Sequence, residues 1–87
     1  MLIIEDNLGA VQIFALLLRD MGHTVEYALN GEAGLEAVAQ FRPQIVLVDI
    51  DLPGIDGFEV CRRIKRDPEL QGIRVIAVTA MAQKKSA

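Results

Sequence analysis

The feature that most constrains the fold is a short apolar run that ends in an acidic residue. Residues 45–48 read Ile-Val-Leu-Val and lead directly into Asp49. A continuous apolar run of this length is typical of a strand that is buried on both faces of a parallel sheet. Two turn signals follow, Pro-Gly at 53–54 and Asp-Gly at 56–57. We therefore expect Asp49 where a central strand ends and a loop begins, which is where open parallel α/β sheets bind ligands.

Three further segments have the character of strands. Residues 2–4 and 75–78 are apolar runs, and they are followed by Glu5-Asp6 and by Thr79. Residues 24–29 alternate weakly and place Val25, Tyr27 and Leu29 on one face, which predicts an outer strand.

Helical patterns fill the intervals between these strands. The first predicted helix covers residues 8–21 and stops at Gly22, and apolar residues occupy nearly all of its circumference. The second follows Asn30-Gly31, because the residues after this pair have helical rather than alternating spacing. It ends at Arg42-Pro43, since helical conformation is disfavoured for the residue before a proline. A third begins near residue 56 or 57 and ends at Asp67-Pro68. Its apolar stripe is expected at Phe58, Cys61 and Ile64. The basic residues are expected to face outward, namely Arg62, Arg63, Lys65 and Arg66. A fourth could begin at residue 80.

Alternating strands and helices predict one α/β domain over residues 1–87, with a parallel sheet and helices on both faces. The composition is 52% hydrophobic and 24% charged, which is globular, and the net charge of -3 argues against a nucleic-acid-binding surface. The single Cys61 cannot form an internal disulfide, which favours a reducing, cytoplasmic setting. No apolar run approaches the ~20 residues of a membrane span.

Polar groups follow three of the predicted strands: Glu5 with Asp6, then Asp49, then Thr79. These strand ends share one edge of a parallel sheet, so their carboxylates would repel each other unless a cation lay among them. Oxygen ligands without His or Cys favour a hard cation, and Mg²⁺ fits best because it keeps waters that a phosphate can displace. A carboxylate can also attack phosphorus and form an aspartyl phosphate, and the Thr79 hydroxyl could donate to a phosphoryl oxygen.

These motifs resemble the receiver domain of two-component response regulators: Glu-Asp-Asn at 5–7, Val-Asp-Ile-Asp-Leu-Pro-Gly-Ile-Asp-Gly at 48–57 and Val-Thr-Ala at 78–80. Each motif alone is weak, but the three in this order are highly specific. The resemblance covers the whole chain. It implies a flavodoxin-like three-layer sandwich whose sheet order, 2-1-3-4, is taken from the family rather than derived.

The resemblance also implies a role for each residue at the strand ends. Asp49 would accept a phosphoryl group from a histidine kinase, a phosphotransfer protein or a small acyl phosphate. Asp6 and Asp49 would ligate Mg²⁺ together with the backbone carbonyl of Asp51, and Glu5 would hold a metal-bound water. Thr79 would hydrogen-bond the phosphoryl group and move toward it as a switch.

The chain departs from the family pattern after Thr79, since the expected fifth strand, its lysine and the fifth helix are missing from the 87 residues. Lys84 and Lys85 lie in the wrong element to replace that lysine. We therefore expect a truncated receiver with impaired phosphorylation. The fourth strand would be an exposed edge, and the first helix would lack cover on one side, so we expect self-association through the fourth strand, the first helix or a domain swap.

Two other function classes compete with a signalling receiver. One is an interaction or oligomerisation fragment that has the receiver fold but no signalling role. The other is a small acid phosphatase, in which an aspartyl nucleophile is followed two residues later by a second acid, as Asp51 follows Asp49. The length leaves no room for a substrate-binding cap, so we do not expect an enzyme.

Overall fold

The computed structural model describes residues 1–78, and its four strands form a single parallel sheet in the order β2-β1-β3-β4. The strands are β1 (Leu2–Ile4), β2 (Glu26–Ala28), β3 (Ile45–Asp49) and β4 (Arg74–Val78). Between them lie α1 (Leu8–Asp20), α2 (Gly31–Phe41), α3 (Gly57–Arg66) and the short 3-10 helix η1 (Pro68–Leu70). The predicted fold class and strand order are confirmed, and residues 80–87, where a fourth helix was expected, lie outside the described part.

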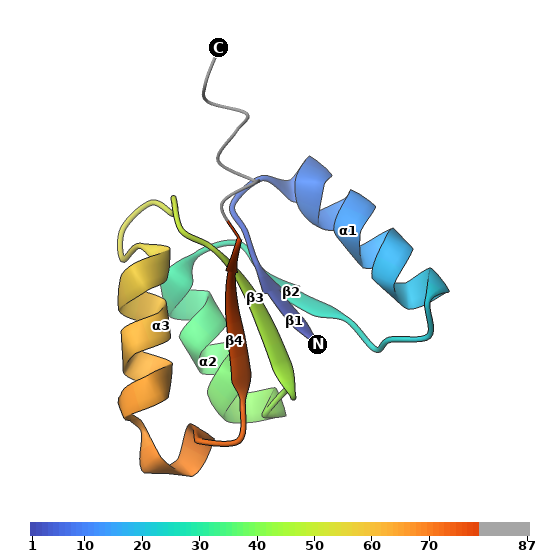
Figure 1. The fold of residues 1–87 in the computed structure, drawn as a ribbon. Helices are drawn as coiled ribbons and strands as arrows, with labels where there is room; N and C mark the ends of the chain where they lie inside the picture. Colours follow the sequence, from blue (N-terminus) through green and yellow to red (C-terminus); the bar gives the residue numbers. More distant parts are fainter. Residues whose placement is uncertain (79–87) are drawn as a thin grey trace.

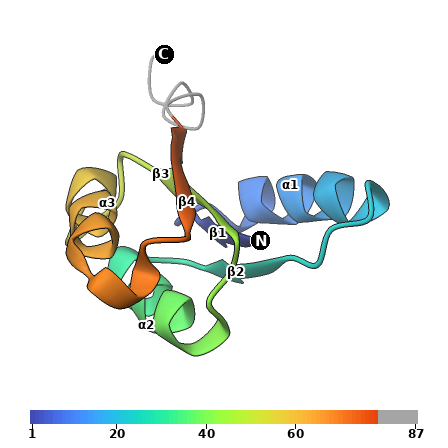
Figure 2. The same cartoon turned by 60° about the horizontal axis from the view of Figure 1, so that its bottom comes forward.

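The sheet is covered unequally on its two faces. Helices α2 and α3 lie side by side on one face, whereas α1 lies alone on the other (Figures 1 and 2). The larger core cluster joins α2, α3 and η1 to the sheet through residues such as Ile4, Val48 and Ile64. The smaller cluster, under α1, contains Ile3, Val11, Ala15 and Val25. The face of the sheet that carries α2 and α3 therefore has the larger core, and the face that carries α1 has the smaller one.

The ends of the first helix follow directly from the sequence. Asn7 caps the N-terminus, because its Oδ1 accepts a hydrogen bond from the Ala10 amide at 3.0 Å. At the other end the His23 amide donates to the Leu18 carbonyl at 3.1 Å and the Gly22 amide donates to the Arg19 carbonyl at 3.0 Å. Gly22 has φ 97°, the left-handed conformation that ends many helices. The predicted stop at Gly22 is confirmed.

Two of the predicted apolar faces are wrong in part. In the predicted strand 24–29, of which β2 forms the middle, Val25 is buried as expected, but Tyr27 and Leu29 are exposed and Ala28 is buried instead. Strand β2 lies at an edge of the described sheet and has a neighbouring strand, β1, on one side only. Its side chains are therefore less covered than those of the central strands. The hydrophobic period alone does not show which positions a neighbouring helix reaches.

On α3 the apolar stripe runs through Val60 and Ile64, with Cys61 half-buried beside it. Phe58, which we assigned to the stripe, is 63% exposed. The basic residues of this helix are exposed as expected, namely Arg62, Arg63, Lys65 and Arg66. The helix packs with a face rotated away from Phe58, because Gly57 and Val60 are the residues that meet the sheet and α2.

Much of the apolar surface of α1 is exposed, as its sequence predicted. Val11 and Ala15 are buried against the sheet, whereas larger side chains on the other faces are more than half exposed: Ile13, Leu16, Leu17 and Met21. Strand β4 lies at an edge of the sheet and has β3 as its neighbour. None of the helices within residues 1–78 is long and apolar enough to cross a membrane.

The corrected face of α3 can be tested by a pair of alanine substitutions. Ile64 is 1% exposed, so Ile64→Ala should lower the free energy of unfolding by about 2–4 kcal/mol through the cavity it leaves. Phe58→Ala should change it by less than about 0.5 kcal/mol, because the ring is largely in solvent. Urea unfolding of the two variants measures both values, and a larger loss for Phe58→Ala would contradict the assigned face.

Candidate metal centre

The pairing of β1 with β3 brings two acidic residues to neighbouring strand ends. The strands are parallel, with Leu2 opposite Val46 and Ile4 opposite Val48. One step further along each strand stand Glu5 and Asp49, which are therefore adjacent. The Glu5 amide donates to the Ala28 carbonyl of β2 at 3.0 Å, which holds this end of β1 in the sheet.

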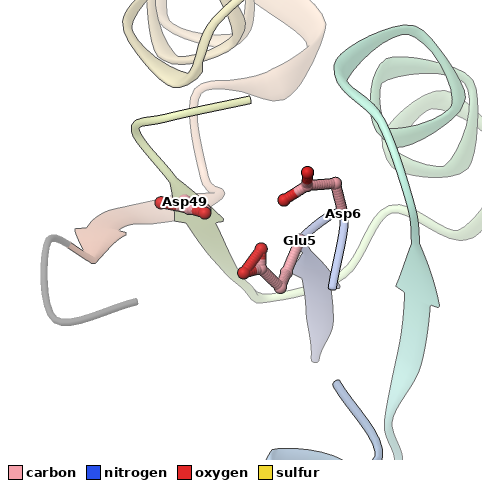
Figure 3. A group of neighbouring side chains, drawn as sticks. All are labelled: Glu5, Asp6 and Asp49. Atoms are coloured by element: carbon pink, nitrogen blue, oxygen red, sulfur yellow. The ribbon is translucent and has the colours of Figure 1, made fainter. Parts of the chain in front are cut away.

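Asp6 completes a group of three carboxylates. Glu5, Asp6 and Asp49 each offer one oxygen, and these three oxygens lie within 4.8 Å of one another. Glu5 and Asp49 are 0% exposed, whereas Asp6 is open to solvent. Figure 3 shows the three side chains extending from the ends of β1 and β3 into one shared space. The predicted convergence of Glu5, Asp6 and Asp49 is confirmed.

The chemistry of this donor set fits a hard divalent cation. Like charges a few ångströms apart repel each other, and burial of two of them strengthens that repulsion by removing water. A cation among them would offset the repulsion, and an all-oxygen set without His or Cys suits Mg²⁺. The exposed position of Asp6 leaves one side open, where water or a phosphate could complete the coordination.

Asp51 is connected to the site through its backbone. Its amide donates a hydrogen bond to Oδ1 of Asp49 at 3.1 Å, two residues back in the chain. This contact fixes the orientation of the Asp49 carboxyl group at the start of the loop. The Asp51 side chain is exposed and does not belong to the group of three carboxylates. Ligation by the Asp51 carbonyl remains a prediction.

Gly57 allows helix α3 to begin directly against the end of β3. Its amide donates to the Ile50 carbonyl at 2.9 Å. A Cβ atom at this position would lie 2.4 Å from the Asp49 carbonyl oxygen and 2.6 Å from the Ile50 Cα. Both are backbone atoms, so a side chain could not be accommodated without moving the strand end that carries Asp49. The sequence predicted a turn at Asp56-Gly57 and a helix that begins near these residues, and the start of the helix is confirmed. The close approach of Gly57 to the end of β3 was not predicted, because no local pattern signals it.

The other residues singled out from the sequence lie away from this group. Thr79, Lys84 and Lys85 are outside the described residues. His23 lines a cavity of about 410 Å³ that also includes Met1 and Arg42. That cavity is formed by residues at the opposite, amino-terminal ends of β1 and β3, and no carboxylate lines it. His23 therefore takes no part in the acidic group.

The charged groups of α3 lie at the surface, whereas its thiol is partly buried. Hydrogen bonds from Arg63 and Arg62 lower the pKa of Glu59, and the Arg63 bond measures 2.8 Å. Exposed pairs of this kind contribute little to stability. Burial raises the pKa of the Cys61 thiol, which keeps it protonated and unreactive at neutral pH. Neither residue contributes to the acidic group.

Comparison with known proteins gives a consistent result. The family model described as "Response regulator receiver domain" matches residues 1–87. The chain is 44% identical over 80 residues to the transcriptional regulatory protein AfsQ1 of Streptomyces coelicolor, covering 92% of this chain and 34% of that protein. It is 40% identical over 83 residues to the polar-differentiation response regulator DivK of Brucella anthropi, covering 95% and 68%. The chain thus spans about a third of the first relative and about two thirds of the second.

Solved structures match the fold closely. The N-terminal domain of a response regulator receiver protein from Methanoculleus marisnigri is 37% identical, with a TM-score of 0.87, over 91% of this chain and 64% of that one. The receiver domain of the sensor histidine kinase PA1611 from Pseudomonas aeruginosa is 27% identical, with a TM-score of 0.84, over 97% and 69%. That second structure has a magnesium ion coordinated in its active site cleft.

The repulsion within the acidic group leads to a prediction about stability. Asp6→Asn removes one negative charge from the group. Without metal, the free energy of unfolding of the variant should exceed that of the parent by roughly 1 kcal/mol, the size of the repulsion between two like charges about 4 Å apart in water. The same variant should lose most of the stabilisation that Mg²⁺ confers by binding the folded state. Thermal unfolding in chelator and in Mg²⁺ measures both effects.

The matched control is Glu36→Gln, which removes an exposed acid from the middle of α2. It should leave the response to Mg²⁺ unchanged. An equal loss of the Mg²⁺ response in both variants would show that the effect is general surface charge rather than a site.

Proposed function

The chain belongs to the response regulator receiver domain family, and from this premise we propose that it accepts a phosphoryl group on Asp49 in two-component signal transduction. The observation that carries the proposal is the convergence of Glu5, Asp6 and Asp49 within 4.8 Å at one edge of the sheet. Phosphoryl transfer requires mainly positioning and neutralisation of charge, and such a group of carboxylates with a bound cation can supply both.

The metal would be held by residues at the ends of β1 and β3 and in the segments that follow these strands. Asp6 and Asp49 would contribute carboxylate oxygens, the Asp51 backbone would contribute its carbonyl oxygen, and Glu5 would hold a metal-bound water. Mg²⁺, when bound, neutralises negative charge on the phosphoryl oxygens. The magnesium ion in the active site cleft of the PA1611 receiver domain supports this assignment.

Asp49 is the residue whose position suits the acceptor role. A carboxylate oxygen of Asp49 would form a bond to phosphorus, while the bond from phosphorus to the donor breaks and the donor keeps that electron pair. The hydrogen bond from the Asp51 amide restricts rotation of the Asp49 carboxyl group. Thr79 lies outside the described residues. Its proposed role is to donate a hydrogen bond to the phosphoryl group and to move toward it as a switch.

The donor class follows from the family. A histidine kinase or a phosphotransfer protein in the cytoplasm would supply the phosphoryl group, and a small acyl phosphate could replace either one in vitro. Receiver domains are signalling modules, and no enzyme family is indicated for this chain.

A second proposal concerns association of the chain with a second copy of itself. In the part of the chain that the structure describes, β4 pairs only with β3, so its other edge presents backbone groups that can pair with another strand. Ile76 lies at the centre of β4 and is 42% exposed. An antiparallel β4–β4 pair about a two-fold axis would place Ile76 opposite its own copy, an isologous contact.

Phosphorylation can be tested on the chain as it stands. Incubation with acetyl phosphate and Mg²⁺ should add the mass of one phosphoryl group, and chelator should prevent the addition. Asp49→Asn should abolish it, whereas Asp51→Asn should retain it, because Asp51 is assigned a role through its backbone carbonyl. Intact-mass spectrometry measures the modification. Modification of the Asp49→Asn variant, or release of phosphate from a phosphomonoester, would contradict the proposal.

Self-association can be tested by light scattering during gel filtration. The parent chain should form dimers at high concentration, and Ile76→Lys should shift it to monomers by placing a charge at the centre of the pairing edge. Ile13→Lys, on the exposed surface of α1, is the control and should leave the dimer intact. A monomeric parent chain at high concentration would overturn the proposal, and loss of the dimer only in Ile13→Lys would move the interface to α1.

A further inference from the structure

The loop between β3 and α3, residues 50–56, is a closed loop that begins and ends at the acidic group. The hydrogen bond from the Gly57 amide to the Ile50 carbonyl joins its two ends at 2.9 Å. On the first limb lies Asp51, whose amide contacts Asp49. On the second limb lies Ile55. Because this hydrogen bond joins the two ends of the loop, we expect a displacement of the second limb to shift the first.

Helix α2 touches the second limb of this loop at a point where no side chain fits. Gly31 is the first residue of α2 and is buried. A Cβ atom on Gly31 would lie 2.6 Å from Cγ1 of Ile55, 2.9 Å from the Ile55 carbonyl oxygen and 2.9 Å from Cγ2 of Val60. All three distances are shorter than real Cβ atoms show. Any other residue at position 31 therefore forces the loop or the helix to move.

The neighbours of Gly31 have little freedom to yield. Ile55 is branched at Cβ and therefore stiff at χ1, and it packs against the larger core cluster. One of the three close atoms belongs to the Ile55 backbone, so a change of rotamer would not remove the conflict. Val60 has no exposed surface.

The helix that carries Gly31 is itself fixed on the sheet. Ala37 and Val38 of α2 are buried in the same core cluster. Gly34, one turn after Gly31, lies so close to β1 that a Cβ there would be 2.4 Å from Cδ1 of Ile4. Movement of α2 away from the sheet would open this packing, so we expect the loop to absorb most of any displacement.

We propose that Gly31 is a positioning residue of the acidic site. Its missing side chain lets the β3–α3 loop rest against the start of α2, and this contact sets where the loop holds the Asp51 backbone and the Asp49 carboxyl group. The inference rests on the proposed function for its consequence in metal binding. The contact between Gly31 and Ile55 itself does not depend on that function.

The experiment compares Gly31→Ala with two matched glycine-to-alanine variants. Gly34→Ala introduces the same methyl group into the same helix, but toward the Ile4 side chain rather than the loop. Gly72→Ala introduces it where no atom lies within 4 Å. Mg²⁺ affinity is measured by calorimetry, and exchange of the Asp51 and Gly57 amide protons is measured by NMR in metal-free protein.

Gly31→Ala should weaken Mg²⁺ binding by about tenfold, as loss of a supporting contact around a metal typically does, and should speed exchange at the Asp51 and Gly57 amides. Gly34→Ala should lower the unfolding temperature while Mg²⁺ affinity stays within about twofold of the parent, because its clash lies in the core. Gly72→Ala should change neither quantity. Equal loss of affinity in the Gly31 and Gly34 variants, or unchanged affinity and exchange in Gly31→Ala, would overturn the proposal.

A compensating substitution covers the case in which Gly31→Ala does not fold. Ile55→Ala removes Cγ1, the nearest of the three crowded atoms and the one that lies only 2.6 Å away, while the two atoms at 2.9 Å stay. The double variant Gly31→Ala/Ile55→Ala should therefore fold and recover part, but not all, of the Mg²⁺ affinity. A double variant no better than Gly31→Ala would count against the loop contact. If the parent chain binds no Mg²⁺, the proposed function fails, while the amide exchange still decides whether Gly31 positions the loop.

Discussion

Two carboxyl groups without solvent-exposed surface, Glu5 and Asp49, lie at adjacent ends of the two central strands. Burial of an ionised carboxylate is costly unless nearby groups compensate for the lost hydration. The third carboxylate, Asp6, adds negative charge rather than compensation. A cation in the shared space would offset the mutual repulsion of these groups, as proposed above for Mg²⁺. The rest of the described structure holds the three oxygens within 4.8 Å of one another.

The scaffold achieves this through the parallel sheet and the close approach of two helices. Parallel pairing of β1 with β3 aligns the strand ends without any loop having to span the distance between them. Gly57 then lets α3 start against the end of β3, and Gly31 lets α2 rest on the intervening loop. A Cβ atom at Gly57 would meet the backbone at the end of β3, and a Cβ atom at Gly31 would meet the Ile55 side chain, the Ile55 carbonyl oxygen and the Val60 side chain. Both positions therefore depend on the absence of a side chain.

The same architecture leaves apolar surface uncovered. Helix α1 alone covers one face of the sheet (Figure 2). Leu16 of α1 and Met21, directly after it, are largely exposed to solvent. At the edge of that sheet, β4 exposes Ile76 beside backbone groups that can pair with a further strand. Surfaces of this kind are typical of association sites. In the described part of the chain, the acidic group and these exposed apolar side chains therefore occupy different parts of the surface.

The sequence by itself determined the order of strands and helices and the acidic residues that follow the strands. Short apolar runs mark buried strands, and the residue after each run must lie at a strand end, so Glu5, Asp6 and Asp49 were identifiable. The strand order came from resemblance, since local pattern carries no information on which strands are neighbours. Only the tertiary structure decided which side chains of α3 and β2 are buried, because burial depends on what packs against each face. It alone revealed the contact between Gly31 and Ile55, since residues 24 positions apart in the chain leave no local signal of their proximity.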